Sequence, residues 1–335
     1  MTGFELYLNL NAKKFDDYLL NFFSSGSHPD MSRYLYDPLR QFSDNAGKRH
    51  RPLICLLACE AVGGDPKKAW PSAAAIEHFH TAALIHDDIE DSSLTRRDEP
   101  CMHISEGIGI AINAGDLALA LVCGTVIDDA GLEDAIKLRV LGELVAMTTR
   151  TIEGQSLDIG WARDDRFDLS VADYLVMANH KTAFYSGAIP LAVGAMIGGG
   201  TEEQVEVLRD FGMATGLAFQ IQDDVLNLVG TRESTKKDFR SDLTEGKRTL
   251  VAIHALETSE RRERLLELLS SRTTDAVELQ EIVDILTESG SIDYAREYGR
   301  QLVVSAKDRL HEALPTSKAR TLLLSMADFF VKRSS

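Results

Sequence analysis

The residues best suited to chemistry lie in the segment HTAALIHDDIEDSSLTRR. An apolar helical run leads into Asp87, Asp88 and Asp91, and the basic pair Arg96 and Arg97 follows. A helix brings residues i and i+4 onto one face, so Asp87 and Asp91 point the same way. Carboxylates bind Mg²⁺, Mg²⁺ binds phosphate oxygens, and guanidinium groups bind phosphate directly. The segment therefore predicts a site for a polyanion, although a solvated helix end would show the same acidic pattern.

A second aspartate pair, Asp223 and Asp224, lies within FQIQDDVLN at the C-terminal end of a predicted helix. The helix dipole favours cations at that end, so carboxylates there are better explained by a bound metal than by the helix itself. Two acidic helix ends that face each other across a cavity would hold several Mg²⁺ ions.

Basic residues occur in small separate sets. These are Lys48, Arg49 and Arg51 in GKRHRP, then Arg96 and Arg97, then Lys181, then Lys236 and Lys237, and finally Lys247 in DLTEGKRTL. Each set alone would be a solvated surface charge. Beside two acidic motifs, their number favours two anionic groups, one held through metal and one held directly.

Composition limits the class of protein. The chain has 335 residues, of which 44% are hydrophobic, and its net charge of −16 argues against nucleic acid or an anionic membrane as the main partner. The N-terminus lacks the pattern of a secretory signal, and no stretch has 18 uninterrupted apolar residues, so we expect no membrane span. The four cysteines lack a zinc-like pairing, which favours buried thiols in a reducing cytoplasm.

Almost every periodic segment has helical spacing, which predicts an all-α chain with a single domain over residues 1–335. The expected helices span residues 4–24, 31–45, 47–63, 65–91, 107–129, 133–163, 170–197, 201–228, 245–257, 259–270, 275–289, 291–313 and 317–332. Capping boxes are expected at Ser170 with Asp173 and at Thr201 with Gln204. The polar segments 92–105 and 230–243 are predicted loops, and the small residues of helix 107–129 predict close helix packing.

The motifs together resemble those of the trans-isoprenyl diphosphate synthases, the polyprenyl synthetase family. GKRxRP, HxxxxxHDDxxD followed by RR, GDxxL, GQxxD, KT, FQIxDD and DLTEGK occur in family order over roughly residues 47–255. DDIEDSSLTRR, GQSLDIGW and SDLTEGKRTLVAIHAL are most similar to geranylgeranyl diphosphate synthases of the eukaryotic type. The resemblance implies a large helical bundle of the isoprenoid synthase type with a central apolar cavity, and a homodimer.

The resemblance also implies roles for individual residues. Three Mg²⁺ ions on an allylic diphosphate would be bound by Asp87, Asp88, Asp91, Asp223 and Asp224, with Lys181 as a further catalytic group. That diphosphate would be contacted by Arg96, Lys181, Gln220, Lys237 and Lys247. Isopentenyl diphosphate would be bound by Lys48, Arg51, His80 and Arg97, and the cavity would be lined by Gln155, Asp158 and Thr182. The allylic C–O bond would ionise, and the double bond of isopentenyl diphosphate would attack the carbocation.

The resemblance sets an expectation for product length as well. In this family the residue five before the first aspartate often forms the floor of the chain pocket, and here it is Ala82, beside Ala83. Phe79, one turn deeper, is the first bulky side chain and predicts a C20 product. The alternative is that Phe79 is core packing and the floor lies on another helix.

The chain departs from the family pattern at three positions. Asp98 and Glu99 replace the usual Gly-Lys after Arg97, and Asn227 stands at the third acidic position of the second motif. Two other functions remain open from the sequence. A class I terpene cyclase would need only the allylic site, and a non-catalytic synthase subunit would tend to lose the aspartates that this chain keeps.

Overall fold

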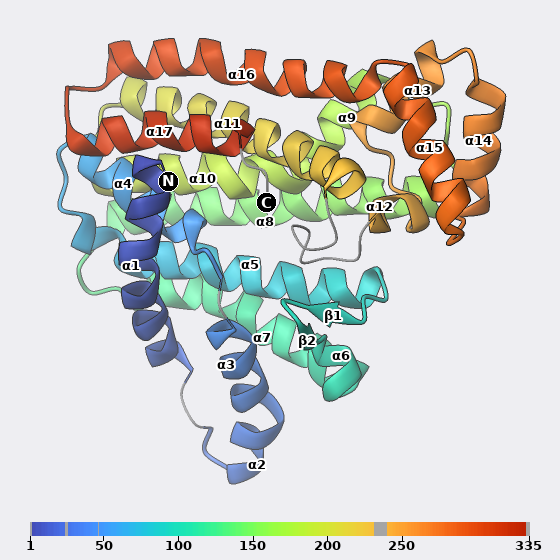
Figure 1. Ribbon diagram of the computed structural model, residues 1–335. Helices are drawn as coiled ribbons and strands as arrows, with labels where there is room; N and C mark the ends of the chain where they lie inside the picture. The colour runs from blue at the N-terminus through green and yellow to red at the C-terminus, as the bar shows by residue number, and fades with distance from the viewer. Residues whose placement is uncertain (1, 24–25, 46, 231–239, 333–335) are drawn as a thin grey trace. The chain divides into compact units, whose positions relative to one another are not determined.

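The computed structural model describes residues 2–23, 26–45, 47–230 and 240–332. It is almost entirely helical, which confirms the predicted all-α class (Figure 1). The chain forms two compact units. The first comprises residues 1–148, 189–209 and 310–326, and the second comprises residues 149–188, 210–309 and 327–335. The boundary falls inside helices rather than in linkers, and the expectation of one domain stays a prediction.

The first unit contains α1 (Gly3–Leu19), η1 (Leu20–Phe22), α2 (Pro29–Met31), η2 (Ser32–Tyr36), α3 (Asp37–Asp44), α4 (His50–Ala61), η3 (Pro66–Ala69), α5 (Trp70–Glu90), β1 (Thr95–Arg96), β2 (Glu99–Pro100), α6 (Met102–Ser105), α7 (Ile108–Ile127) and α10 (Ile189–Ile197). The second contains α9 (Val171–Ala178), η4 (Asn179–Ala188), α12 (Ser241–Thr244), α13 (Leu250–Thr258), α14 (Arg262–Ser271) and α15 (Ala276–Glu288). Four helices have parts in both, namely α8 (Asp134–Arg163), α11 (Glu202–Val229), α16 (Ser291–Ala313) and α17 (Lys318–Lys332).

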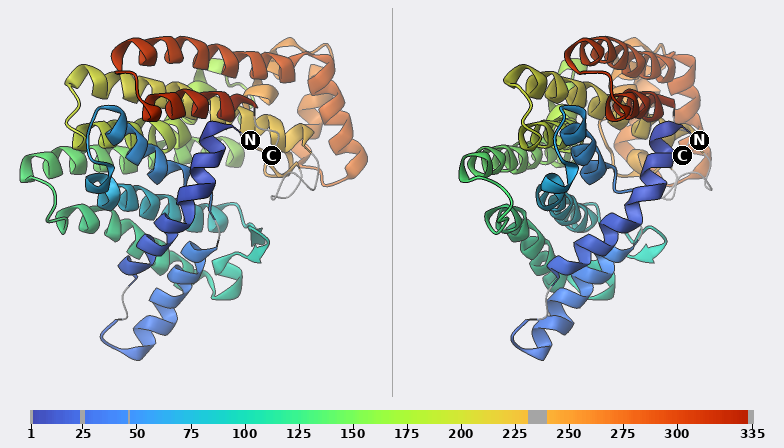
Figure 2. Two further views of the ribbon diagram at one scale, coloured as in Figure 1. Left: turned by 60° about the vertical axis from the view of Figure 1, so that its left-hand side comes forward. Right: turned by 90° about the vertical axis from the view of Figure 1, so that its left-hand side faces the viewer.

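Small residues bring the helices of the first unit close together. Helix α7 lies along α5, and Ala111, Ala114 and Ala118 are fully buried in the apolar cluster that this pair shares with α3 and α6 (Figures 1 and 2). A Cβ on Gly115 would lie 2.3 Å from His86 Nε2, so a larger residue there would displace the His86 ring. The predicted close approach is confirmed at these residues but is wrong at Gly107 and Gly109, where a Cβ would meet nothing within 4 Å.

Helix α7 has a second property. Among the described residues it is the one helix long and apolar enough to cross a membrane by length and composition, and 39% of that window is buried. A core helix passes the same test, and the alanine face of α7 packs against α5 in this way.

The predicted loop 92–105 contains a short hairpin that sequence spacing did not indicate. Strand β1 pairs antiparallel with β2, with Arg96 opposite Glu99. The two residues between them, Arg97 and Asp98, both have positive φ, at 54° and 68°. Consecutive left-handed residues form the tight turns that match the twist of a two-strand hairpin.

The predicted helix 170–197 is divided in the structure. Helix α9 begins at the confirmed capping box of Ser170 and Asp173, and it leads into the π-helix η4 and then α10. Pro190, which has no N–H to donate, is the second residue of α10, immediately after the π-helix. The second capping box, Thr201 with Gln204, is also confirmed.

Candidate active site

The first aspartate motif closes on a guanidinium from the hairpin. Asp88 is 1% exposed, and both of its oxygens accept hydrogen bonds from Arg96 Nε, at 2.7 and 2.8 Å. Arg96 also contacts Asp87 at 3.5 Å. Burial alone would lower the pKa of Arg96, but hydrogen bonding to Asp88 and the charges of both aspartates outweigh it and raise that pKa. Arg96 therefore supplies a counter-charge for the buried Asp88. Asp87 and Asp91 remain half-buried.

The second aspartate motif is held by neutral donors. Asp224 on α11 is 6% exposed and accepts hydrogen bonds from Tyr174 Oη at 2.9 Å and from Gln220 Nε2 at 2.6 Å. Thr182 on η4 donates to Gln220 Oε1 at 2.8 Å. Burial, followed by the charge of Asp242, raises the pKa of Asp224 well above its usual range. Two predicted site residues, Gln220 and Thr182, thus belong to one network with Asp224.

Tyr174 is a part of this network that the sequence reasoning missed. It is buried in the core of the second unit, and burial together with Asp224 raises its pKa well above the usual value. Tyr174 precedes Asp224 by 50 positions, and no local pattern links the two residues.

Lys181 lies at a tight helix contact in the same unit. Its Nζ donates to Asp158 Oδ2 at 2.5 Å, which places these two predicted site residues beside each other. A Cβ on Gly154 of α8 would lie 2.2 Å from the backbone nitrogen of Lys181. Gly154 in the GQxxD motif therefore lets η4 approach α8 closely, and this approach sets the position of Lys181. Gln155, the next residue, is half-buried.

The segment around DLTEGK holds a further lysine. Lys247 Nζ lies 2.6 Å from Glu245 and 3.8 Å from Asp242. Asn227 accepts from the backbone N–H of Asp242, so the residue that departs from the acidic pattern fixes the start of α12. The predicted site residue Lys237 lies outside the described residues.

Three of the four residues expected to bind isopentenyl diphosphate, Arg51, His80 and Arg97, lie near one another in the first unit. Arg51 Nη1 lies 3.0 Å from His80 Nε2, and because a guanidinium can only donate, that nitrogen is the acceptor. Burial and the nearby Arg51 lower the pKa of His80 well below its usual range, which keeps the imidazole neutral. Arg97 donates from Nη1 to the carbonyl of Asn45, and Lys48 is exposed on the segment before α4.

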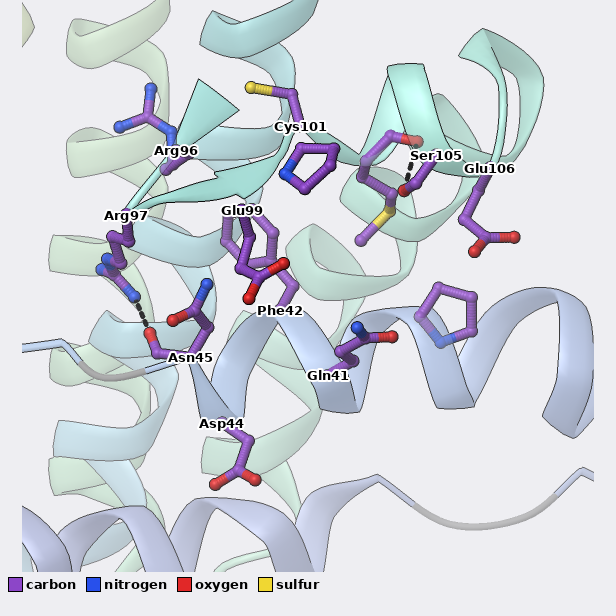
Figure 3. Close-up of a pocket in the computed structure, with 13 residues that line it drawn as sticks. Gln41, Phe42, Asp44, Asn45, Arg96, Arg97, Glu99, Cys101, Ser105 and Glu106 are labelled. Atoms are coloured by element: carbon purple, nitrogen blue, oxygen red, sulfur yellow. Dashed lines mark hydrogen bonds between the residues drawn. The ribbon is translucent and has the colours of Figure 1, made fainter. Parts of the chain in front are cut away.

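One of these residues, Arg97, lines a pocket of about 270 Å³ (Figure 3). Its lining comes from α3, the hairpin and α6, and it includes Arg96, Arg97 and Glu99. The Glu99 side chain extends toward α3, and Arg97 reaches the Asn45 carbonyl from the same hairpin (Figure 3). Asp98 is exposed and does not line this pocket, so the two acidic departures have different surroundings.

The residues expected to set product length lie on α5. Ala82 is fully buried in the cluster with Ala111 and Ala114, so it faces α7. Phe79 is 2% exposed, and Ala83 is half-buried. Whether Phe79 forms the floor of a chain pocket stays a prediction.

The two aspartate motifs offer only oxygen donors, as hard Mg²⁺ prefers. Within the described residues no three histidine, cysteine or acidic side chains converge as a ready-made metal site. This donor set suits Mg²⁺, which keeps several waters and is commonly bound by one or two carboxylates plus substrate phosphate. The residues therefore fit an ion that arrives with a phosphate ligand.

Comparisons with known proteins agree with this chemistry. The family model described as polyprenyl synthetase matches residues 32–286. A short chain isoprenyl diphosphate synthase of Methanothermobacter thermautotrophicus is 42% identical over 86% of both chains. A geranylfarnesyl diphosphate synthase of Natronomonas pharaonis is 36% identical over 90% of both. The structure of a Corynebacterium glutamicum geranylgeranyl pyrophosphate synthase, complexed with isoprenyl diphosphate and magnesium, matches with a TM-score of 0.87 and 28% identity over 99% of both chains.

Proposed function

Because this chain belongs to the polyprenyl synthetase family and is a prenyl diphosphate synthase, we propose that it makes geranylgeranyl diphosphate from isopentenyl diphosphate and an allylic diphosphate, farnesyl or shorter. One observation carries the proposal. An aspartate motif and a separate cationic set, Arg51 with His80 and Arg97, occur in the same unit. Two diphosphates need two sites, whereas a cyclase would need one.

The allylic diphosphate would be held mainly through metal. Three Mg²⁺ ions, when bound, would withdraw electron density from the diphosphate and so ease cleavage of the allylic C–O bond. The half-buried Asp87, Asp91 and Asp223 are the accessible ligands among the five aspartates. Asp88 and Asp224 would have to exchange the hydrogen bonds described above for a metal.

The cationic side chains would supply the remaining charge. Lys181, Arg96, Gln220, Lys237 and Lys247 would contact the allylic diphosphate, and Lys181 would move from Asp158 to a phosphate oxygen. Such preorganised donors stabilise the charge that develops on the leaving group. The side chains of Gln155, Asp158 and Thr182 would line the cavity beside it.

The second substrate would be oriented by Lys48, Arg51, His80 and Arg97. The neutral His80 accepts a hydrogen bond from Arg51 and so holds that guanidinium in one orientation. The double bond then attacks the allylic carbocation, forming the new C–C bond. A proton leaves to the departing diphosphate, and the product is five carbons longer.

Separate KM measurements for the two substrates test these two sites directly. Arg97→Ala and Lys48→Ala should raise KM for isopentenyl diphosphate more than for the allylic substrate, and Arg96→Ala and Lys181→Ala should do the opposite. Equal effects on both substrates in all four variants would contradict the two-site assignment.

We propose that product length is set by the residues that precede Asp87 on α5. The small side chains of Ala82 and Ala83 would leave space for the growing prenyl chain below the aspartates. Phe79 would then close the pocket at C20. Phe79→Ala should shift the product to C25 or longer by chromatography, and Ala82→Phe should shorten it to C15. An unchanged C20 product from folded Phe79→Ala would move the floor to another helix.

The assembly is proposed to be a homodimer. Helix α7 keeps Ile108, Ile112 and Ile127 exposed, and α8 adds Leu138 and Val145 within the same unit. Covering such side chains with a second copy would remove apolar surface from water. Light scattering at low protein concentration should give twice the chain mass.

We further propose that the protein acts in the cytoplasm, in keeping with its cysteines, which are free thiols. One incubation tests the whole function. With Mg²⁺, isopentenyl diphosphate and a C15 allylic diphosphate, elongation to C20 is expected. A cyclic hydrocarbon would indicate a cyclase, and no product from folded protein would indicate a non-catalytic subunit.

A further inference from the structure

Arg49 stands among the proposed substrate-binding cations, yet its side chain is only 2% exposed. Its Nε donates to Asp16 on α1 at 2.5 Å, and its Nη1 donates to Glu77 on α5 at 2.6 Å. Nη2 donates to the backbone carbonyl of Ser43, at the end of α3. One guanidinium therefore joins three helices to the residue that precedes α4.

A second arginine holds the same end of α3. Arg97 donates to the carbonyl of Asn45, two residues beyond Ser43 (Figure 3). The last carbonyls of a helix carry partial negative charge and favour cationic donors. Gly47 lies between the two guanidiniums, since a Cβ there would be 3.1 Å from Arg49 Nη1 and 3.2 Å from Arg97 Nη2.

The backbone of Arg49 also has a defined role. It adopts the left-handed conformation, with φ 48° and ψ 30°, and its carbonyl accepts the hydrogen bond from Leu53 N that begins α4. A non-glycine residue holds this conformation only when its surroundings compensate for the cost. The three acceptors of the Arg49 side chain supply that compensation.

Charge explains why this arginine needs acidic partners. Lys48, Arg51 and Arg97 are close in the fold or in the sequence, and a fourth cation would repel them. The carboxylates of Glu77 and Asp16 neutralise Arg49, and their pull outweighs the effect of burial and raises its pKa. The segment can therefore keep a buried arginine without adding its charge to that of its neighbours.

We propose that Arg49, with Glu77 and Asp16, is a positioning cluster that fixes segment 47–51 so that Lys48 and Arg51 meet one diphosphate. The inference rests on the proposed function, because it takes those two residues as ligands of isopentenyl diphosphate. Arg49 acts through them and does not itself touch substrate.

The test compares Arg49→Lys, Glu77→Gln and Asp16→Asn with the parent enzyme. Each should raise KM for isopentenyl diphosphate about fivefold or more, with kcat within twofold and KM for the allylic substrate unchanged. Lysine has one ammonium and cannot reach three acceptors in the geometry of a guanidinium. Glutamine keeps the size of Glu77 and its acceptor oxygen, so that variant isolates the charge.

Asp17→Asn is the matched control. Asp17 is next to Asp16 on α1 but is 65% exposed and pairs with Lys13 on the surface, so its KM values should not change. If Arg49→Lys does not fold, Asp16→Asn decides, because Asp16 is 23% exposed and provides one acceptor of three.

Lys48→Ala, measured in parallel, distinguishes failure of the positioning cluster from failure of the substrate assignment. A raised isopentenyl KM in Lys48→Ala beside unchanged values in folded Asp16→Asn and Arg49→Lys would overturn the positioning cluster alone. An unchanged value in Lys48→Ala would overturn the substrate assignment and this inference with it. An equal rise for both substrates in the cluster variants would show general loosening of the fold and would also overturn it.

Discussion

The two aspartate motifs both bury their second aspartate, but different kinds of partner stabilise it. In each, the second aspartate is buried and both of its oxygens accept hydrogen bonds from protein donors. Asp88 is neutralised by the guanidinium of Arg96, whereas the donors to Asp224 among the described residues are the neutral Tyr174 and Gln220. The buried aspartate of the first motif is therefore paired with a cation, whereas within the described residues that of the second is held by neutral donors.

The difference bears on how each motif would respond to a cation. Neutral donors stabilise a buried carboxylate less than a guanidinium does, and burial with the charge of Asp242 raises the pKa of Asp224 despite its two hydrogen bonds. The second motif thus has more to gain from a bound divalent ion. In the first, Arg96 competes with the metal for Asp88, and a diphosphate would give that arginine an alternative partner.

The largest effect should come from replacing one accessible aspartate in each motif. Asp87→Asn and Asp223→Asn should each lower kcat by about 100-fold or more, since each would remove a metal ligand that acts in the transition state. Steady-state rates at saturating Mg²⁺ measure this, with thermal melts as the control for folding. A variant that keeps more than about a tenth of the parent kcat, a loss below ~1.4 kcal/mol, would refute the metal role of that motif.

Removing the counter-charge of the first motif should have the next largest effect. Arg96→Leu leaves Asp88 buried and unpaired, which should lower the free energy of unfolding by about 3–5 kcal/mol in urea. The double variant Asp88→Leu with Arg96→Leu should recover most of that loss. Failure of the double variant to recover would mean that packing, and not charge, dominates at this pair.

Removing a neutral donor from the second motif should cost less. Tyr174→Phe keeps the buried ring but deletes the hydrogen bond to Asp224, so we expect a loss of about 1–3 kcal/mol in the same urea experiment. Tyr298→Phe, in the same unit and only partly buried, serves as the control. A loss as large as that of Arg96→Leu would contradict the distinction between charged and neutral partners.

The smallest effect concerns the hairpin that presents Arg96. Asp98 has a φ of 68°, so Asp98→Gly should relieve backbone strain and raise the free energy of unfolding by about 0.5–1 kcal/mol. Thermal melts would detect the shift. Adding Glu99→Lys should also lower KM for isopentenyl diphosphate, because Glu99 lines the pocket beside Arg97. An unchanged KM would show that Glu99 does not affect that substrate.

Local sequence determined much of this protein. The all-α class follows from helical periodicity, and the boxes at Ser170 and Thr201 were predictable because each bond spans only three residues. Helix α16 spans the predicted residues 291–313. One departure from the predicted helix bounds also has a local cause. The helix expected from residue 245 begins at Leu250, because Gly246 is left-handed and Thr249 forms the cap.

Tertiary structure decided which residues of the motifs are buried and what holds them. Tyr174 reaches Asp224 across 50 positions, and Arg49 reaches Asp16 and Glu77 across 33 and 28. A motif names the residue types that chemistry needs, but burial and charge partners depend on side chains from distant helices. GKRHRP places Arg49 in one basic set with Lys48 and Arg51, and only the packing of α1, α3 and α5 around Arg49 shows that its charge is paired with Asp16 and Glu77. The physical reason is that hydrogen bonding within a turn is encoded by adjacent residues, whereas the desolvation and pairing of a charge depend on the whole fold.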